Sequence, residues 1–340
     1  MNPSSTPPPK SATHHRHHHH QPSVVVFGEI PPILSSYFPL NSLDKFHFLK
    51  PFESPTTLHH FLTSQAQSAR ALLCIGPVPV DADTLRCMPS LECVVATSVG
   101  VDHVDLQECR LRGIDVTNAG DSFSEDVADF AVGLLLDVLR RVSASDRYVR
   151  SGLWALKGDY PLGLQQLRGK RVGILGLGRI GSEIAKRIEA FGCIISYNSR
   201  KKRPSVPYPY YSNANDLASN SDILILSCAL TAETHHIVNK SIMSALGKKG
   251  IIINVGRGAL VDEKELVHFL VNGEIGGAGL DVFENEPDVP KELVELDNVV
   301  VSPHKAVLTP ESLAATFDLA MANLDAFFSN KPLLSQVNLE

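Results

Sequence analysis

Short apolar runs recur through the chain, and most neighbouring pairs leave room for a helix between them. In the second half they show little alternation of polar and apolar residues, as in Ile-Leu-Ile-Leu at 223–226 and Ile-Ile-Ile at 251–253. Strands of this kind are buried on both faces, which is typical of parallel sheets covered by helices. We therefore predict an α/β chain. The expected strands lie at 24–28, 46–49, 71–75, 93–97, 114–117, 171–175, 193–197, 223–228, 251–255, 278–282 and 299–302.

A long helical pattern divides these strands into two series. Its apolar residues recur at helical spacing from Val127 to Val138, and Ser122 with Glu125 matches a capping box at its start. At ~150 residues per domain, 340 residues also favour two doubly wound parallel-sheet domains. The stretch 151–163 is expected to be an irregular excursion, and an amphipathic helix at 310–328 could join either domain.

Composition excludes several classes of protein. The net charge is −6 and no run approaches the ~20 apolar residues of a bilayer crossing, so neither a nucleic-acid partner nor a membrane is expected. With 44% hydrophobic and 20% charged residues, the chain can bury a core. Its six cysteines include no Cys-x-x-Cys pair, which argues against a disulfide framework or a zinc site. We expect a cytoplasmic protein without a bound metal.

Residues 1–22 differ from the rest, with five prolines, six of the fourteen histidines and no acid. A disordered, proline-spaced tail is the favoured interpretation. A metal-binding tract, a remnant purification tag and an organelle transit peptide are the alternatives, and the last would place the protein in a plastid or another organelle.

A glycine-rich turn, Gly-Leu-Gly-Arg-Ile-Gly at 176–181, follows the first strand of the second series and opens an amphipathic helical pattern. Gly176 permits a tight turn, Gly178 lets the backbone approach a pyrophosphate, and Gly181 allows the helix to pack closely on the sheet. The helix N-terminus adds free N–H groups and a favourable dipole. In this context the motif predicts a dinucleotide site.

The residues after the next strand bear on the type of dinucleotide. NAD sites usually have an acid about twenty residues beyond the glycines, where it binds the ribose hydroxyls. Here the strand ends in Asn-Ser-Arg-Lys-Lys-Arg at 198–203, without a carboxylate. These cations suit a 2′-phosphate, so NADPH is expected ahead of NADH, with Arg200 as the main contact and Ser199 and Lys201 assisting. A solvated basic loop is the alternative.

Three polar residues, Arg257, Glu286 and His304, each follow a buried strand of the second series. Because the carboxyl ends of parallel strands share one edge, the three can converge beside a nicotinamide. Together they suit reduction of a 2-keto acid. Arg257 can bind the carboxylate and polarise the keto group, His304 can protonate the carbonyl oxygen, and Glu286 can orient the imidazole. The histidines at 103, 235, 236 and 268 are expected to lack partners.

With these motifs in place, the chain from Ser23 to Val337 resembles the D-isomer-specific 2-hydroxyacid dehydrogenase family. Within it, the chain is similar to plant glyoxylate/hydroxypyruvate and hydroxyphenylpyruvate reductases. The matching segments are 169–181, 254–258, 279–283 with Glu286-Pro287, and 302–304 for the family, and 150–154, 158–163 and 197–200 for the plant enzymes.

The resemblance implies a Rossmann cofactor domain, 121–304, inserted into a flavodoxin-like substrate domain, 23–120 plus 305–340. It also implies a homodimer, in which Trp154 either reaches the neighbouring subunit's active site or is a buried anchor for an irregular loop. The implied cofactor contacts include the amides of Arg179 and Ile180, and Asp281 at the carboxamide; Cys228 is expected to complete the site. For the substrate carboxylate, the implied contacts are backbone around Ile75, Gly76, Val99 and Gly100.

The expected activity is NADPH-dependent reduction of hydroxypyruvate to D-glycerate and of glyoxylate to glycolate. A reductase of aromatic 2-keto acids such as hydroxyphenylpyruvate is one alternative, and a non-catalytic NADP(H)-sensing protein is another. Lys305 follows His304, where relatives often have a small residue. An ammonium group there could favour anionic substrates or point to solvent.

Overall fold

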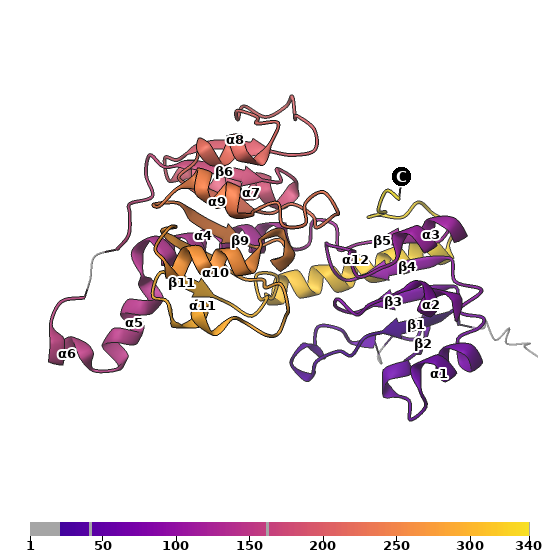
Figure 1. Ribbon diagram of the computed structural model, residues 1–340. Helices are drawn as coiled ribbons and strands as arrows, with labels where there is room; N and C mark the ends of the chain where they lie inside the picture. Colours follow the sequence, from indigo (N-terminus) through magenta and orange to yellow (C-terminus); the bar gives the residue numbers. More distant parts are fainter. Residues whose placement is uncertain (1–20, 41–42, 161–162, 340) are drawn as a thin grey trace, which may run out of the picture.

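The computed structural model describes residues 21–40, 43–160 and 163–339, which form two lobes, each built on a parallel sheet (Figure 1). The first sheet has the order β2-β1-β3-β4-β5, the flavodoxin-like arrangement. Its strands are β1 (Ser23–Phe27), β2 (His47–Leu49), β3 (Ala71–Cys74), β4 (Cys93–Ala96) and β5 (Asp115–Thr117).

The second sheet has the order β11-β10-β9-β8-β6-β7, and a parallel bridge between Tyr197 and Tyr210 continues it beyond β7. Its strand order reverses beside β6, as in Rossmann folds, where the ligand crevice opens at the carboxyl ends of the strands. Both the fold class and the positions of the strands agree with the sequence prediction. The strands are β6 (Arg171–Leu175), β7 (Ile194–Asn198), β8 (Ile223–Leu226), β9 (Ile251–Asn254), β10 (Gly277–Leu280) and β11 (Val299–Val301).

Helices cover both sheets, and short polar side chains cap several of them. Asp81, Asp105 and Asp262 each accept a hydrogen bond from a backbone N–H three residues further on, which stabilises the first turn. The helices are α1 (Leu58–Gln65), α2 (Ala82–Arg86), α3 (Leu106–Arg112), α4 (Ser124–Arg140), α5 (Val142–Arg150), α6 (Leu153–Lys157), α7 (Arg179–Ala190), α8 (Ala214–Ser219), α9 (Lys240–Leu246), α10 (Glu263–Val271), α11 (Lys291–Glu295) and α12 (Pro310–Phe328), with 3-10 turns at Pro32–Leu34, Pro51–Glu53 and Gly258–Leu260.

Two long helices join the lobes. Helix α4 packs on α7 and the second sheet, whereas α12 returns to the first sheet, where Leu313, Phe317 and Leu324 enter the core (Figure 1). Near its start, Thr309 Oγ1 donates to Asp126 Oδ2 (3.0 Å), which ties the two helices together.

Two local expectations were wrong. The capping box does not form, because residues 119–124 make two successive turns and α4 begins only at Ser124, without a side-chain cap. Ser122 instead offers its carbonyl oxygen to Ser312 Oγ at 2.9 Å. The stretch 151–163 is only partly irregular, since it contains α6, which projects with α5 from the second lobe (Figure 1).

The six cysteines are free thiols. Among the described helices, none combines the length and the apolar character that crossing a bilayer requires. The prediction for the tail falls almost entirely outside the described residues.

Candidate active site

The glycine turn connects β6 to α7 in a shape that suits a pyrophosphate. Gly176 has φ +98°, and a Cβ there would lie 2.5 Å from the backbone of Cys228. A Cβ on Gly181 would lie 2.2 Å from the carbonyl oxygen of Gly176. Nothing lies within 4 Å of the corresponding position at Gly178, and no side chain caps α7. The first amides of α7, which include those of Arg179 and Ile180, therefore lack a side-chain cap and lie at the positive end of the helix.

Cys228 is a structural neighbour of this turn. Burial raises the pKa of its thiol to about 11, so the group is neutral at physiological pH. The side chain of Arg179 turns away from the turn and forms an ion pair with Asp121.

The basic run after β7 lies against the same turn. Ser199 Oγ accepts the N–H of Leu177 (3.0 Å), and Arg203 Nη1 donates to the carbonyl oxygen of Leu177 (2.6 Å). Arg200 and Lys201 are exposed. Hydrogen bonding within its own loop lowers the pKa of Glu233, and the nearby charge of Arg200 adds to that effect. Arg200 thus approaches the loop that follows β8. The contact of Arg203 was not predicted from the sequence, which favours Arg200, because it depends on how the loop folds back on the turn.

His304 and Glu286 form a direct pair. His304 Nδ1 lies 2.8 Å from Glu286 Oε2, while Glu286 Oε1 accepts the N–H of Phe283 (3.0 Å). Partial burial raises the pKa of Glu286, but these hydrogen bonds and the positive charges of His304 and Arg257 outweigh it, so the net pKa is lowered. The carboxylate therefore stays ionised and fixes the imidazole ring, leaving Nε2 for a substrate.

Asp281 holds the histidine loop in place. Its buried carboxylate accepts hydrogen bonds from Ser302 Oγ (2.6 Å) and from the amides of Lys305 (2.8 Å) and Ala306 (3.0 Å). Its carbonyl oxygen accepts the N–H of His304, which has φ +51°. The structure thus shows Asp281 supporting His304, and its expected contact with a carboxamide stays a prediction. The Lys305 side chain is exposed.

Arg257 reaches from the second lobe to the first. Its Nε donates to Asp102 (3.1 Å to Oδ1) and its Nη1 donates to the carbonyl oxygen of Gly256 (2.9 Å). A Cβ on Gly100 would lie 2.0 Å from Nη2, so the guanidinium rests directly over that glycine. The role of Asp102 was not predicted from the sequence. The available signal was its position two residues after Gly100, an expected substrate contact.

Two backbone segments of the first lobe were expected to face a substrate carboxylate. The amides of Ile75 and Gly76 are already engaged, with the carbonyl of Phe27 (2.8 Å) and with Thr97 Oγ1 (3.3 Å). Within the described ranges, no acceptor bonds the amides of Val99 and Gly100. Of the two segments, 99–100 therefore offers free donors beside Arg257.

Three of the other histidines do have partners, contrary to expectation. His236 Nε2 lies 2.6 Å from Glu284 Oε1, His103 Nε2 lies 3.6 Å from Cys74 Sγ, and His268 contacts Asn272 at 3.2 Å. The first two contacts join segments that periodicity alone does not bring together, whereas the third is an i,i+4 pair at the end of α10. Trp154 lies on α6 and is 62% exposed, away from these groups.

The site combines a glycine-lined helix N-terminus with Arg257, Glu286 and His304 at the carboxyl edge of the same sheet. This combination defines a nicotinamide-nucleotide-dependent dehydrogenase. The profile described as "D-isomer specific 2-hydroxyacid dehydrogenase, NAD binding domain" matches residues 132–306. The chain belongs to the D-isomer-specific 2-hydroxyacid dehydrogenase family, as the sequence motifs indicated.

Individual relatives are similar over most of their length. A glyoxylate/hydroxypyruvate reductase of Arabidopsis thaliana is 61% identical over 287 residues, covering 84% of this chain and 88% of its own. A hydroxyphenylpyruvate reductase of Plectranthus scutellarioides is 50% identical over 295 residues, 87% of this chain and 94% of its own. The NADPH-dependent glyoxylate/hydroxypyruvate reductase of Sinorhizobium meliloti, solved with NADP and malonate, has a TM-score of 0.86 at 39% identity, covering 94% of this chain and 97% of that one.

Proposed function

We propose that this protein is an NADPH-dependent reductase of small 2-keto acids, acting on hydroxypyruvate and glyoxylate to give D-glycerate and glycolate. The observation that supports this most directly is the grouping of three side chains. Glu286 pairs with His304 at 2.8 Å, and against the effect of burial the hydrogen bonds of His304 and Phe283, with the charges of His304 and Arg257, lower the pKa of Glu286. An anion-binding group and a proton donor therefore lie together beside the glycine turn.

The residues have separate tasks in this mechanism. Arg257 binds the substrate carboxylate with the N–H groups that Asp102 and Gly256 leave free, and the amides of Val99 and Gly100 add donors. When bound, the reduced nicotinamide supplies the hydride. His304 donates a proton from Nε2 to the carbonyl oxygen, and Glu286 stabilises the imidazolium before that transfer. Replacing His304 with alanine should lower kcat by about 10²–10⁴-fold, as for other general acids.

The NADPH preference rests on the basic run and on the named relatives. Arg200 and Lys201 are exposed at the carboxyl end of β7, where a 2′-phosphate would lie. The related Sinorhizobium meliloti reductase is NADPH-dependent by its description.

A substrate panel tests the proposal. Initial rates of NADPH and NADH oxidation are measured with glyoxylate, hydroxypyruvate and hydroxyphenylpyruvate. Higher kcat/KM for the two small acids with NADPH supports it. Preference for hydroxyphenylpyruvate would favour the aromatic alternative, to which the 50% identical Plectranthus enzyme belongs by name. Nucleotide binding without turnover of any 2-keto acid would favour a sensor.

We also propose that two copies associate through the projecting α5–α6 arm. Val149, Trp154 and Leu156 are 53%, 62% and 80% exposed there, and such apolar exposure on neighbouring turns is typical of an interface. Light scattering should give twice the monomer mass of 37.0 kDa, and Trp154→Asp with Leu156→Asp should give monomers. A monomeric wild type would refute this.

A cytoplasmic location is likewise proposed, and imaging of a fusion at the C-terminus tests it against organelle import.

A further inference from the structure

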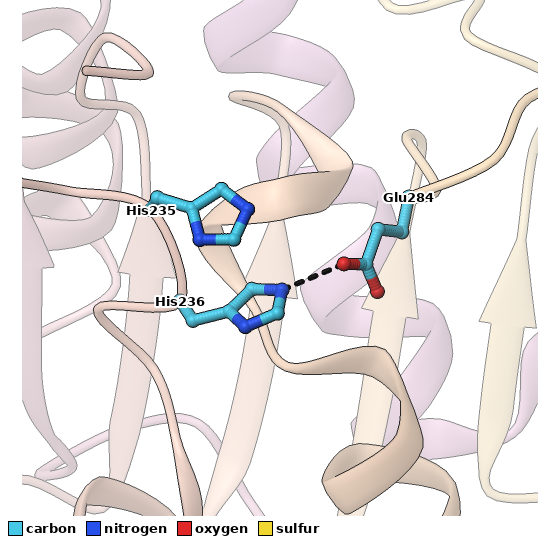
Figure 2. Close-up of side chains that lie close together, drawn as sticks. All are labelled: His235, His236 and Glu284. Carbon is cyan, nitrogen blue, oxygen red and sulfur yellow. Dashed lines mark hydrogen bonds and ion pairs between the residues drawn. The ribbon is translucent and has the colours of Figure 1, made fainter. Parts of the chain in front are cut away.

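Two adjacent histidines and a glutamate lie together outside the catalytic pair. His235 and His236 belong to the loop after β8, and Glu284 belongs to the loop after β10. His236 Nε2 is 2.6 Å from Glu284 Oε1, and the two imidazole rings stack with centroids 4.0 Å apart (Figure 2). One ligand atom from each of the three residues lies within 4.8 Å of the others. His235 is exposed and the other two are half-buried, so an ion can reach them from solvent.

The backbone holds two of these residues in position independently of their side chains. His236 has φ +51°, a conformation that non-glycine residues seldom adopt, and its N–H donates to the carbonyl oxygen of Ala259 (2.8 Å). The N–H of Glu284 donates to Glu263 Oε2 (3.1 Å). A Cβ on Gly258 would lie 2.4 Å from that same Glu284 nitrogen, so both loops pack on the 258–260 turn that follows β9.

The surroundings are negative. Asp262 Oδ2 lies 4.0 Å from His236 Nδ1, on the opposite side of the ring from Glu284. Glu263 adds a third carboxyl group; burial raises its pKa, the hydrogen bond from the Glu284 N–H lowers it, and the charge of Glu284 adds to the net rise. Three carboxyl groups around two imidazoles favour a cation. A carboxylate behind the second nitrogen of a histidine is also the usual partner of a metal-binding imidazole, because it fixes the tautomer.

We propose that His235, His236 and Glu284 bind a zinc ion. Two imidazole nitrogens and one carboxylate oxygen form a donor set that zinc accepts, with a fourth position left for water. His236 binds through Nε2, and Asp262 Oδ2, now 4.0 Å from Nδ1 and beyond hydrogen-bond distance, closes on the Nδ1–H to orient it. Tetrahedral zinc–nitrogen bonds set the ligand atoms about 3.3 Å apart, so the exposed His235 side chain must rotate toward the site and the 2.6 Å pair of His236 and Glu284 must open slightly.

Such an ion would link the loop after β8 to the loop that holds Glu286, two residues from Glu284. It would therefore stabilise the folded protein whether or not the reductase assignment is correct.

Calorimetric titration with zinc chloride tests the site in the full-length chain, with the six histidines of residues 1–20 changed to asparagine so that they do not compete. One zinc ion per chain should bind and should raise the Tm. His235→Asn with His236→Asn should abolish saturable binding, and the single His235→Asn, at an exposed position, should weaken it without affecting folding. His268→Asn is the matched control, because that histidine contacts Glu274, Asn272 and Phe269 outside the proposed site, and the variant should bind zinc normally.

Asp262→Asn tests the orienting role separately. Asparagine still caps α10, where Asp262 Oδ1 accepts the N–H of Glu265, so the fold is kept while the charge is lost. Zinc affinity should fall about 10–100-fold, the usual cost of losing a partner beyond the ligands. Absence of stoichiometric zinc binding, or binding that survives the double histidine change, would overturn the proposal. Unchanged affinity in Asp262→Asn would refute this arrangement of the site.

Discussion

Replacing Arg257 with alanine removes the group that binds the substrate carboxylate in the proposed mechanism. An arginine has five N–H donors. Here Nε donates to Asp102 and one Nη1–H donates to Gly256, which leaves three donors on Nη1 and Nη2. Two of these can bind one carboxylate side by side. Each charge-assisted hydrogen bond contributes about 1.5–3 kcal/mol, so the loss of two costs about 3–6 kcal/mol. At 1.36 kcal/mol per factor of ten, kcat/KM should fall about 10²–10⁴-fold.

The assay is the initial rate of NADPH oxidation with glyoxylate and hydroxypyruvate. Because the change also leaves Asp102 without its cation, the double variant Arg257→Ala with Asp102→Asn serves as control, and it should be as inactive as the single one. NADPH binding and Tm show whether the variants fold. A folded Arg257→Ala protein whose kcat/KM stays within about threefold of wild type, less than 1 kcal/mol, would refute the reasoning.

Three further predictions concern neighbouring groups. Arg200→Asp should lower the NADPH/NADH ratio of kcat/KM at least about tenfold through loss of a charge-assisted contact, and Lys202→Asp should change it less; equal effects would argue for a diffuse charge effect. Gly100→Ala places a Cβ 2.0 Å from Arg257 Nη2, and the displaced guanidinium should cost about 10²-fold in kcat/KM, whereas unchanged kinetics would contradict the packing. The pKa of Glu286 is lowered in the folded state, so its contribution to stability is present above the ordinary glutamate pKa and is lost as pH falls through the folded value. The difference in unfolding free energy between wild type and Glu286→Gln should therefore shrink on acidification. A constant difference in urea titrations at several pH values would contradict this.

The fold could be predicted from sequence because its signals are local. Strands buried on both faces appear as apolar runs, and the position of a residue after such a run places it at the carboxyl edge of the sheet. This was enough to select Glu286 and His304, which the structure places 2.8 Å apart.

Contacts between distant segments could not be predicted in this way. Asp102 meets Arg257 only because the two lobes come together, across 155 positions of sequence. His236 and Glu284 are 48 positions apart and meet where two loops pack against each other. The capping box failed for a related reason, since Ser122 matches the local rule but its carbonyl oxygen is bonded to α12. In each case tertiary packing decides the partner.

The most direct test of the mechanism is a crystal structure of the protein with NADP and oxamate, an unreactive analogue of a 2-keto acid. The mechanism predicts the analogue's carboxylate within about 3 Å of Nη1 and Nη2 of Arg257, and its carbonyl oxygen at hydrogen-bond distance from His304 Nε2. A carboxylate bound away from Arg257, or a histidine on the opposite side of the nucleotide from the arginine, would contradict it.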